Sequence, residues 1–185
     1  MENTIKIGNQ VWTSKNLDVE TYRNGDVIPQ VQDKNAWANL KTGAWCYYEN
    51  KTSNGKKYGK LYNWYAVNDK RGLAPKGFHI PSDAEWTILT DYLGGEEEFG
   101  TEMKSSTGWD SNGNGTNSSG FAGFPGGCRS YNGTFYNIGR FGSWWSATEN
   151  NSYFAWGRDL DCNDGDVNRA NGRRRSAFSV RCLGD

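Results

Sequence analysis

Apolar and polar residues alternate around a short turn near the start of the chain. The pattern covers Ile5–Trp12, and Gly8-Asn9 separates its two halves. Successive side chains of a strand point to opposite faces, so alternation on both sides of a turn is typical of two paired strands. The sequence therefore predicts a β-hairpin at the start of the fold.

Two helices are predicted in the next part of the chain. Asp33 is a residue type that favours a helix N-cap, and Trp37 and Leu40 would then share one face of a short helix. Farther along, four apolar residues within Lys60–Val67 predict a second helix, which we expect to be buried.

The clearest local pattern begins at Pro81. Ser82 and Glu85 have the spacing of a capping box, in which each side chain accepts a hydrogen bond from the other residue's backbone N–H. Gly94-Gly95 is a typical helix end. The apolar residues between these signals recur at helical spacing: Trp86, Leu89, Tyr92 and Leu93. We expect a helix here, and a shorter one around Glu96–Lys104.

The character of the chain changes after Ser105. The segment Thr107–Gly120 is rich in Gly, Asn and Ser and predicts a surface loop. The remainder, to Asp185, has the pattern of short strands joined by polar loops. Helices first and strands last favour the α+β class over a doubly wound sheet. With neither a repeat nor a linker, residues 1–185 are expected to form one domain.

One predicted strand, Phe154–Asp161, alternates large and small residues. Its even-numbered positions hold Phe, Trp, Arg and Leu, and its odd-numbered positions hold Ala, Gly, Asp and Asp. Because side chains alternate across a strand, we expect one large, fixed face and one small, polar face that points outward. The pattern predicts that Gly157, Asp159 and Asp161 can differ without disturbing the core.

Charge and aromatic content narrow the possible functions. Lys and Arg total 21, as do Asp and Glu, so the formal net charge is zero, which argues against a nucleic-acid partner. No apolar stretch approaches the roughly 18 residues of a membrane span, so direct membrane insertion is not expected. Nine Trp, ten Tyr and eight Phe can supply the core. We expect five tryptophans there: Trp12, Trp64, Trp86, Trp144 and Trp145.

Candidate catalytic groups are scarce. His79 is the single histidine, and its place beside Pro81 at the helix entry favours a structural role. The four cysteines lack the spacing of a zinc site, and no G-x-S-x-G motif is present. We therefore assign no catalytic residue and no metal ligand.

Several sequence blocks run nearly from end to end of the chain. They are Ile7–Trp12 with Asn16-Leu17, Tyr58–Val67, Pro75–Pro81, Asp83–Trp86, Gly120-Phe121, Pro125–Gly127 with Arg129, Trp144–Glu149 and Phe178–Cys182. In content and order these blocks resemble the FISUMP family, the major paralogous domain found in many bacterial and phage proteins.

The resemblance implies a loop-rich C-type-lectin-like fold, shared more distantly with formylglycine-generating enzymes. We expect two main helices on a small twisted antiparallel sheet. The chain is also similar to variable proteins of diversity-generating retroelements, in which adenine-directed mutagenesis rewrites a C-terminal stretch. That similarity implies a variable region at 128–185, on a phage virion or bacterial cell surface as part of a larger protein.

The expected function is non-catalytic recognition of a protein or glycan ligand on a cell surface. Gly, Asp, Ser and Cys are all reachable from Asn or Tyr codons by changing adenine alone, although Gly and Asp are also common in ordinary loops. The expected ligand-binding residues are Ser130, Tyr131, Arg140, Phe141, Ser143, Tyr153, Gly157, Asp159, Asp161, Cys162, Asn163, Asp164, Asp166, Asn168, Ala170 and Asn171.

The same residues also allow other interpretations, namely a metal site or a different function. The acidic stretch Asp159–Asp166 offers hard oxygen ligands, but an EF-hand alignment fails at Asp164 and Ala170, so no cofactor is assigned and a structural calcium ion is left as an alternative. A copper-dependent formylglycine-type oxidase would need a second cysteine near Cys128.

The main rival function is an ordinary adhesion or scaffold module of a bacterial surface protein. The Arg173–Arg175 run is either an orienting patch or a solvated loop.

The resemblance also bears on disulfides. Family members often carry a cysteine at the position of Ala74, where it could pair with the equivalent of Cys182. Because this chain lacks that partner, we expect free thiols.

Overall fold

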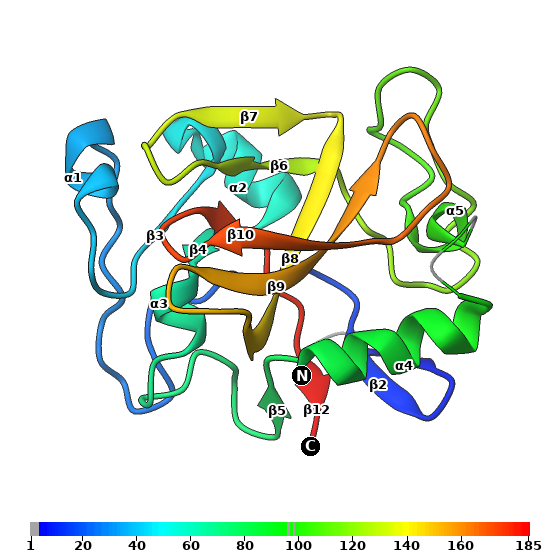
Figure 1. The fold of residues 1–185 in the computed structure, drawn as a ribbon, viewed down its shortest axis with the longest axis horizontal. Coiled ribbons are helices and arrows are strands. Elements are labelled where there is room, and N and C mark those ends of the chain that lie inside the picture. The colour runs from blue at the N-terminus through cyan, green and yellow to red at the C-terminus, as the bar shows by residue number, and fades with distance from the viewer. Residues whose placement is uncertain (1–3, 96, 98) are drawn as a thin grey trace.

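A computed structural model describes residues 4–95, 97 and 99–185 of the chain. Strands outnumber helices in a mixed α/β architecture (Figure 1). The elements, in chain order, are β1 (Thr4–Ile7), β2 (Gln10–Thr13), α1 (Lys34–Ala38), β3 (Trp45–Cys46), the 3₁₀ helix η1 (Tyr48–Asn50), α2 (Thr52–Tyr58), β4 (Leu61–Asn63), α3 (Trp64–Val67), β5 (Phe78–His79), α4 (Asp83–Leu93), α5 (Gly100–Met103), β6 (Gly126–Arg129), β7 (Phe135–Ile138), β8 (Phe141–Glu149), β9 (Phe154–Asp161), β10 (Asn168–Arg173), β11 (Ala177–Phe178) and β12 (Leu183–Gly184).

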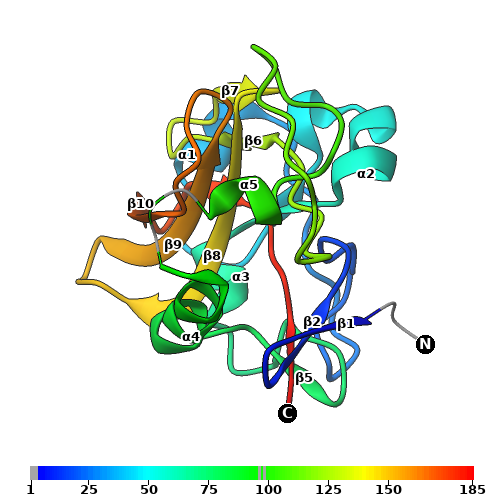
Figure 2. The ribbon, with the colours of Figure 1, turned by 90° about the vertical axis from the view of Figure 1, so that its right-hand side faces the viewer.

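The N-terminal hairpin is confirmed. β1 and β2 pair antiparallel, and β12 and β5 extend them to a four-stranded sheet in the order β1-β2-β12-β5. This sheet lies at the end of the molecule opposite β6 and β7 (Figures 1 and 2). The last strand of the chain is therefore fixed beside the first hairpin.

The second sheet is larger than the sequence suggested. Its strands follow the order β10-β9-β8-β6-β11-β4-β3, and β7 pairs with β6. The pairing is antiparallel except between β6 and β8, which meet in parallel at Gly127 and Gly142. The expectation of a small twisted antiparallel sheet was therefore wrong in size, and one pairing departs from it.

Helix α4 begins and ends as predicted. The Ser82 hydroxyl accepts from the Glu85 N–H at 3.3 Å, and the Glu85 carboxylate accepts from the Ser82 N–H at 2.8 Å. Gly94 ends the helix at a φ of 123°, a conformation that favours glycine. The helix packs against β8 and β9 (Figure 2). Its Trp86 shares a core cluster with Trp144 of β8 and Leu160 of β9.

The predicted helix over Lys60–Val67 was wrong in its first half. Leu61–Asn63 form strand β4 between β3 and β11, and the helix α3 covers only Trp64–Val67. The side chain of Asn63 accepts from the Ala66 N–H and caps this short helix. A short apolar run fits a buried strand as well as a helix, so its pattern did not distinguish them.

The other predicted helices are present but short. Asp33 caps α1 by accepting from the Ala36 N–H at 2.7 Å, as predicted. The helix expected around Glu96–Lys104 is reduced to α5, and positions 96 and 98 lie outside the described residues. Among the described residues there is therefore one long helix, α4, instead of two main ones. None of the helices in the described ranges is long and apolar enough to span a bilayer.

The aromatic core is confirmed. All five expected tryptophans are at most 2% exposed. Trp144 and Trp145 are consecutive on β8 and enter different clusters: Trp144 packs with Trp12, Trp86 and Phe121, whereas Trp145 packs with Trp64 and others. Because neighbouring side chains of a strand point to opposite faces, β8 contributes a tryptophan to the core on each side.

Candidate ligand-binding face

Three adjacent strands bring polar residues of the predicted surface into one line. In the register of β8, β9 and β10, Asp159 lies directly opposite Ser143 on one side and Asn168 on the other. Directly opposed residues of neighbouring strands share a face of the sheet. The three side chains therefore belong to one face, although they are far apart in the sequence.

The line continues onto two further strands. The parallel pairing of Gly127 with Gly142 places Cys128 beside Ser143, and Cys128 lies opposite Tyr136 on β7. Charge interaction between Asp159 and Cys128 agrees with this placement. We call the five residues the cross-strand row: Asn168, Asp159, Ser143, Cys128 and Tyr136.

The cross-strand row is buried in its middle and open at its ends. Ser143 is 5% exposed and Cys128 and Asp159 are partly buried, whereas Tyr136 is 46% exposed and Asn168 is exposed. The middle residues therefore form a floor, and the end residues stand at its rims.

Asp159 has an unusual environment for a carboxylate. Its Oδ1 is buried and has no hydrogen-bond partner among the described residues, while Ser143 supplies a hydrogen bond to the carboxyl group. Burial raises the pKa of Asp159 to about 6, against the lowering effect of Ser143. Burial, and then the Asp159 charge, raises the pKa of Cys128 to about 11, so its thiol stays protonated at neutral pH.

Other predicted residues flank the cross-strand row on the same face. Phe141 lies opposite Asp161, and Ala170 lies opposite Gly157. Phe141, Asp161 and Ala170 are partly exposed, as expected for an outward surface. The alternation in β9 places Asp159 and Asp161 on one face, but that face is only partly exposed at these two residues and is buried at Ala155 and Gly157, so a wholly outward polar face is not what the structure has.

Two predicted variable positions are corrected by the structure. Gly157 is buried, and a Cβ there would lie 2.6 Å from the backbone oxygen of Trp144 on the adjacent strand. Cys162 is 4% exposed and packs in the core cluster with Trp86 and Leu160. Neither position is free to differ. Ser143 is likewise not a projecting contact, because it belongs to the floor.

The remaining predicted residues lie around this face or away from it. Asn171 is exposed on β10 but pairs with Trp156, which places it on the opposite face of the sheet. Tyr153 is 72% exposed in the turn between β8 and β9. Tyr131, in the β6–β7 turn that Ser130 begins, stacks on Arg173 at 4.5 Å. Arg140 is exposed in the turn before β8, and its carbonyl accepts from the Cys162 N–H.

The arginine run is more ordered than either sequence interpretation allowed. Arg174 donates to the Asn151 carbonyl and pairs with Glu149, and Arg175 donates to the Ala38 carbonyl. Arg173 alone is exposed. Two of the three charges therefore hold loops together.

The acidic connection between β9 and β10 is organised by its own hydrogen bonds. Asp161 accepts from the Asn163 N–H at 3.0 Å, and Asp164 accepts from the Asp166 N–H at 3.1 Å. Such bonds are typical of Asx turns. Within the described residues, no three His, Cys, Asp or Glu side chains converge as a metal site. The four cysteines, all of them described, are free thiols.

Sequence reasoning missed two members of the cross-strand row, Cys128 and Tyr136. A signal was present: Asn132-Gly133 lies between β6 and β7, and this pair favours a tight hairpin turn. Recognising that hairpin would have placed Tyr136 on a strand beside Cys128.

The comparisons with known proteins give one match. The family model described as the Fibrobacter succinogenes major domain matches residues 5–183. No curated protein and no solved structure matches the chain.

Proposed function

The chain belongs to the Fibrobacter succinogenes major domain family, and from that premise we propose that it is a non-catalytic recognition domain whose ligand binds over the cross-strand row. The family suggests a domain of a surface protein. The resemblance to C-type-lectin-like variable proteins supports a protein or glycan on a cell surface as the ligand.

The observation that carries the proposal is the buried carboxylate of Asp159. A buried polar atom without a partner costs about 1–3 kcal/mol, and more when the group is charged. Among the described residues, nothing bonds to its Oδ1. Oδ1 itself is enclosed, but Asp159 as a residue stays partly exposed, so a ligand with a hydrogen-bond donor offsets this cost if the floor shifts on binding and lets the donor reach the carboxyl group.

The surroundings of Asp159 suit a binding surface. Strand backbones on both sides fix its position, so little conformational entropy is lost on binding. Tyr136 and Phe141 provide aromatic contacts beside the floor, and Asp161 and Asn168 provide adaptable polar contacts. This combination of rigid aromatic and short polar residues resembles antibody binding loops.

Diversification of this face is part of the proposal. Only positions whose side chains point away from the core can vary, so we limit the variable set to exposed or partly exposed members of 128–185 and exclude Gly157 and Cys162. Sequencing many copies of this locus should give substitutions at adenine-containing codons of these positions. Variation spread over exposed loops of the whole chain, including Lys51–Lys57, would instead indicate an ordinary adhesion module.

A display experiment tests the binding capacity directly. One library randomises four outward positions beside Asp159, namely Tyr136, Phe141, Asp161 and Asn168. A matched library randomises four outward positions on α4: Ala84, Ile88, Asp91 and Tyr92. Selection against one purified test protein should yield specific binders from the first library. Equal success of the α4 library would contradict a dedicated binding face.

A further inference from the structure

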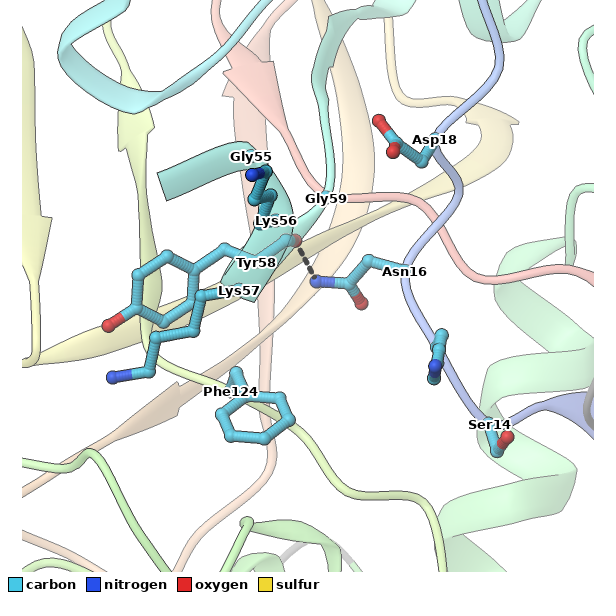
Figure 3. Close-up of a pocket in the computed structure, with 10 residues that line it drawn as sticks. Ser14, Asn16, Asp18, Gly55, Lys56, Lys57, Tyr58, Gly59 and Phe124 are labelled. Atoms are coloured by element: carbon cyan, nitrogen blue, oxygen red, sulfur yellow. Dashed lines mark hydrogen bonds between the residues drawn. The ribbon is translucent and has the colours of Figure 1, made fainter. Parts of the chain in front are cut away.

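A second site lies outside the cross-strand row. A groove of about 270 Å³ separates helix α2 from the segment that follows β2 (Figure 3). Lys15 enters it from that segment, and Lys56 and Lys57 enter it from the last turn of α2. The groove shares no residue with the cross-strand row.

The three lysines give the groove an uncompensated positive charge. All three are exposed, and within the described ranges none of them forms an ion pair. Like charges held at one groove raise the local concentration of anions. This is notable in a chain whose overall formal charge is zero.

The acidic residue in the groove lining does not cancel this charge. Asp18 accepts from the Lys60 ammonium at 2.5 Å, and the Lys60 side chain is only 2% exposed. The ammonium of Lys60 also lies 4.4 Å from the centre of the Trp45 ring. Lys60 also lies 3.5 Å from the Glu20 carboxylate, so this one lysine offsets the two carboxylates in part, and the three groove lysines still outnumber the negative charge that remains.

Aromatic rings form the other part of the lining. The rings of Tyr58 and Phe124 meet edge to face with centroids 6.3 Å apart, and the Lys57 ammonium lies 4.9 Å from the centre of the Tyr58 ring. In Figure 3 the chain of Lys57 extends past Tyr58, and Phe124 lies at the same groove. Apolar ring surface beside mobile positive charge suits a ligand with both C–H faces and acidic groups.

We propose that this groove binds an acidic sugar residue, carboxylated or sulfated, of a polysaccharide. Lysine is a point charge on a flexible stem and accepts an anion without the fixed fork geometry of arginine. The partly exposed ring of Phe124 contacts the C–H surface of the sugar, the buried ring of Tyr58 supports Phe124 from below, and the lysines contact the acidic group. A bare inorganic anion uses the lysines alone.

The proposed site is tested by adding ligands to the whole chain and monitoring the backbone amide NMR shifts. The probes are an oligogalacturonate, a sulfated heparin-derived oligosaccharide, a neutral cello-oligosaccharide and inorganic phosphate. At least one acidic oligosaccharide should give saturable shifts at residues 14–18 and 55–59, weakened by added salt. Failure of both acidic sugars to bind, or equally tight binding of phosphate or the neutral sugar, would overturn the proposal.

Variants separate a site from general attraction. Replacing Lys56 and Lys57 by Ala should weaken binding about tenfold, from the loss of two exposed charge contacts. The matched control replaces Lys41 and Lys70, two lysines of a different surface hollow, and should change affinity less than twofold. Phe124→Ala should weaken sugar binding but not phosphate binding. The site would be refuted if the Lys41/Lys70 control lost as much affinity as the Lys56/Lys57 variant. It would also be refuted if neither the Lys56/Lys57 variant nor Phe124→Ala, when folded, changed sugar binding.

Discussion

Each face of strand β9 carries a charged residue, and the two residues differ in whether an opposite charge among the described residues pairs with them. On the face that packs against α4, Arg158 is 1% exposed and its guanidinium donates to Asp83 at 2.7 Å. Arg169 of β10 binds the same carboxylate at 2.8 Å and stacks on Trp156 at 3.5 Å. On the other face, within the described part of the chain, Asp159 keeps an oxygen without a partner.

The difference separates charges that stabilise the fold from a charge to which we assign a role in the proposed ligand binding. A buried ion pair with additional hydrogen bonds fixes one element on another, and removing a partner is costly. A buried carboxylate with an unsatisfied oxygen weakens the free protein, and the proposed ligand binding at this face would account for its presence. Substitutions on each face should therefore have opposite effects on stability.

The largest effect is expected at Asp83. Asp83→Ala removes the carboxylate that binds both Arg158 and Arg169, and it leaves a buried guanidinium without its counter-charge. We expect the free energy of unfolding to fall by about 3 kcal/mol. Denaturant unfolding measures this value. Asp91→Ala, on the exposed side of the same helix, is the control and should change stability by less than about 0.5 kcal/mol. Equal effects of the two variants would show that the ion cluster does not hold α4 on the sheet.

The second effect has the opposite sign. In the folded protein the pKa of Asp159 is raised from 3.8 to about 6 by burial. Between these pH values the folded state binds more protons than the unfolded state, so stability falls as pH rises from about 4 to about 6. Asp159→Asn should remove this fall and raise the free energy of unfolding at pH 8 by about 2 kcal/mol, which is less than the full shift implies because Asp159 is partly exposed. Unfolding curves across this pH range measure it, and a destabilised variant would contradict an unsatisfied carboxylate.

The third effect tests which outward positions can vary. Gly157→Ala forces a Cβ against the Trp144 backbone and should lower the free energy of unfolding by about 2 kcal/mol. Asn168→Ala, at an exposed position of the adjacent strand, should change it by less than about 0.5 kcal/mol. Thermal unfolding of both variants makes the comparison. If Gly157→Ala proved as neutral as Asn168→Ala, position 157 would return to the variable set.

Features encoded by neighbouring residues were predictable from the sequence. The capping box at Ser82 and the cap at Asp33 involve residues three positions apart, so their spacing specifies their geometry. Leu61–Asn63 became a strand because β3 and β11 pair with it, and β11 is more than 100 residues away in the chain. A short apolar run does not contain that information.

The sequence predicted which residues of the candidate site share a face of the sheet, but it did not predict how deeply each residue is buried. Alternation within β9 assigned Asp159 and Asp161 to the same face, because alternation is a property of a single strand. The burial of Gly157 depends on how closely β8 approaches, and that of Cys162 on the packing of a distant cluster. The position of Cys128 and Tyr136 in the cross-strand row depends on the order of strands in the sheet, which a single sequence does not reveal.

The smallest effect concerns the end of the molecule away from this face, and it sharpens the pH test of Asp159. The His79 ring lies 2.9 Å from both Asp185 and Glu85. Burial lowers the pKa of His79, but these two carboxylates outweigh burial and raise it above 6.5. The folded state then binds the extra proton, so this stabilisation is complete below about pH 6.5 and is lost as pH rises through the folded pKa.

Because His79 is partly exposed, His79→Gln should lower stability at pH 6 by only a few tenths of a kcal/mol, with no change at pH 9. The His79 effect lies at higher pH than the Asp159 effect, so the two variants should flatten different parts of the stability profile. Urea unfolding of the single and double variants across pH 4–9 separates them. If His79→Gln removed the change between pH 4 and 6, that change would not belong to Asp159, and the main support for the proposed binding face would be lost.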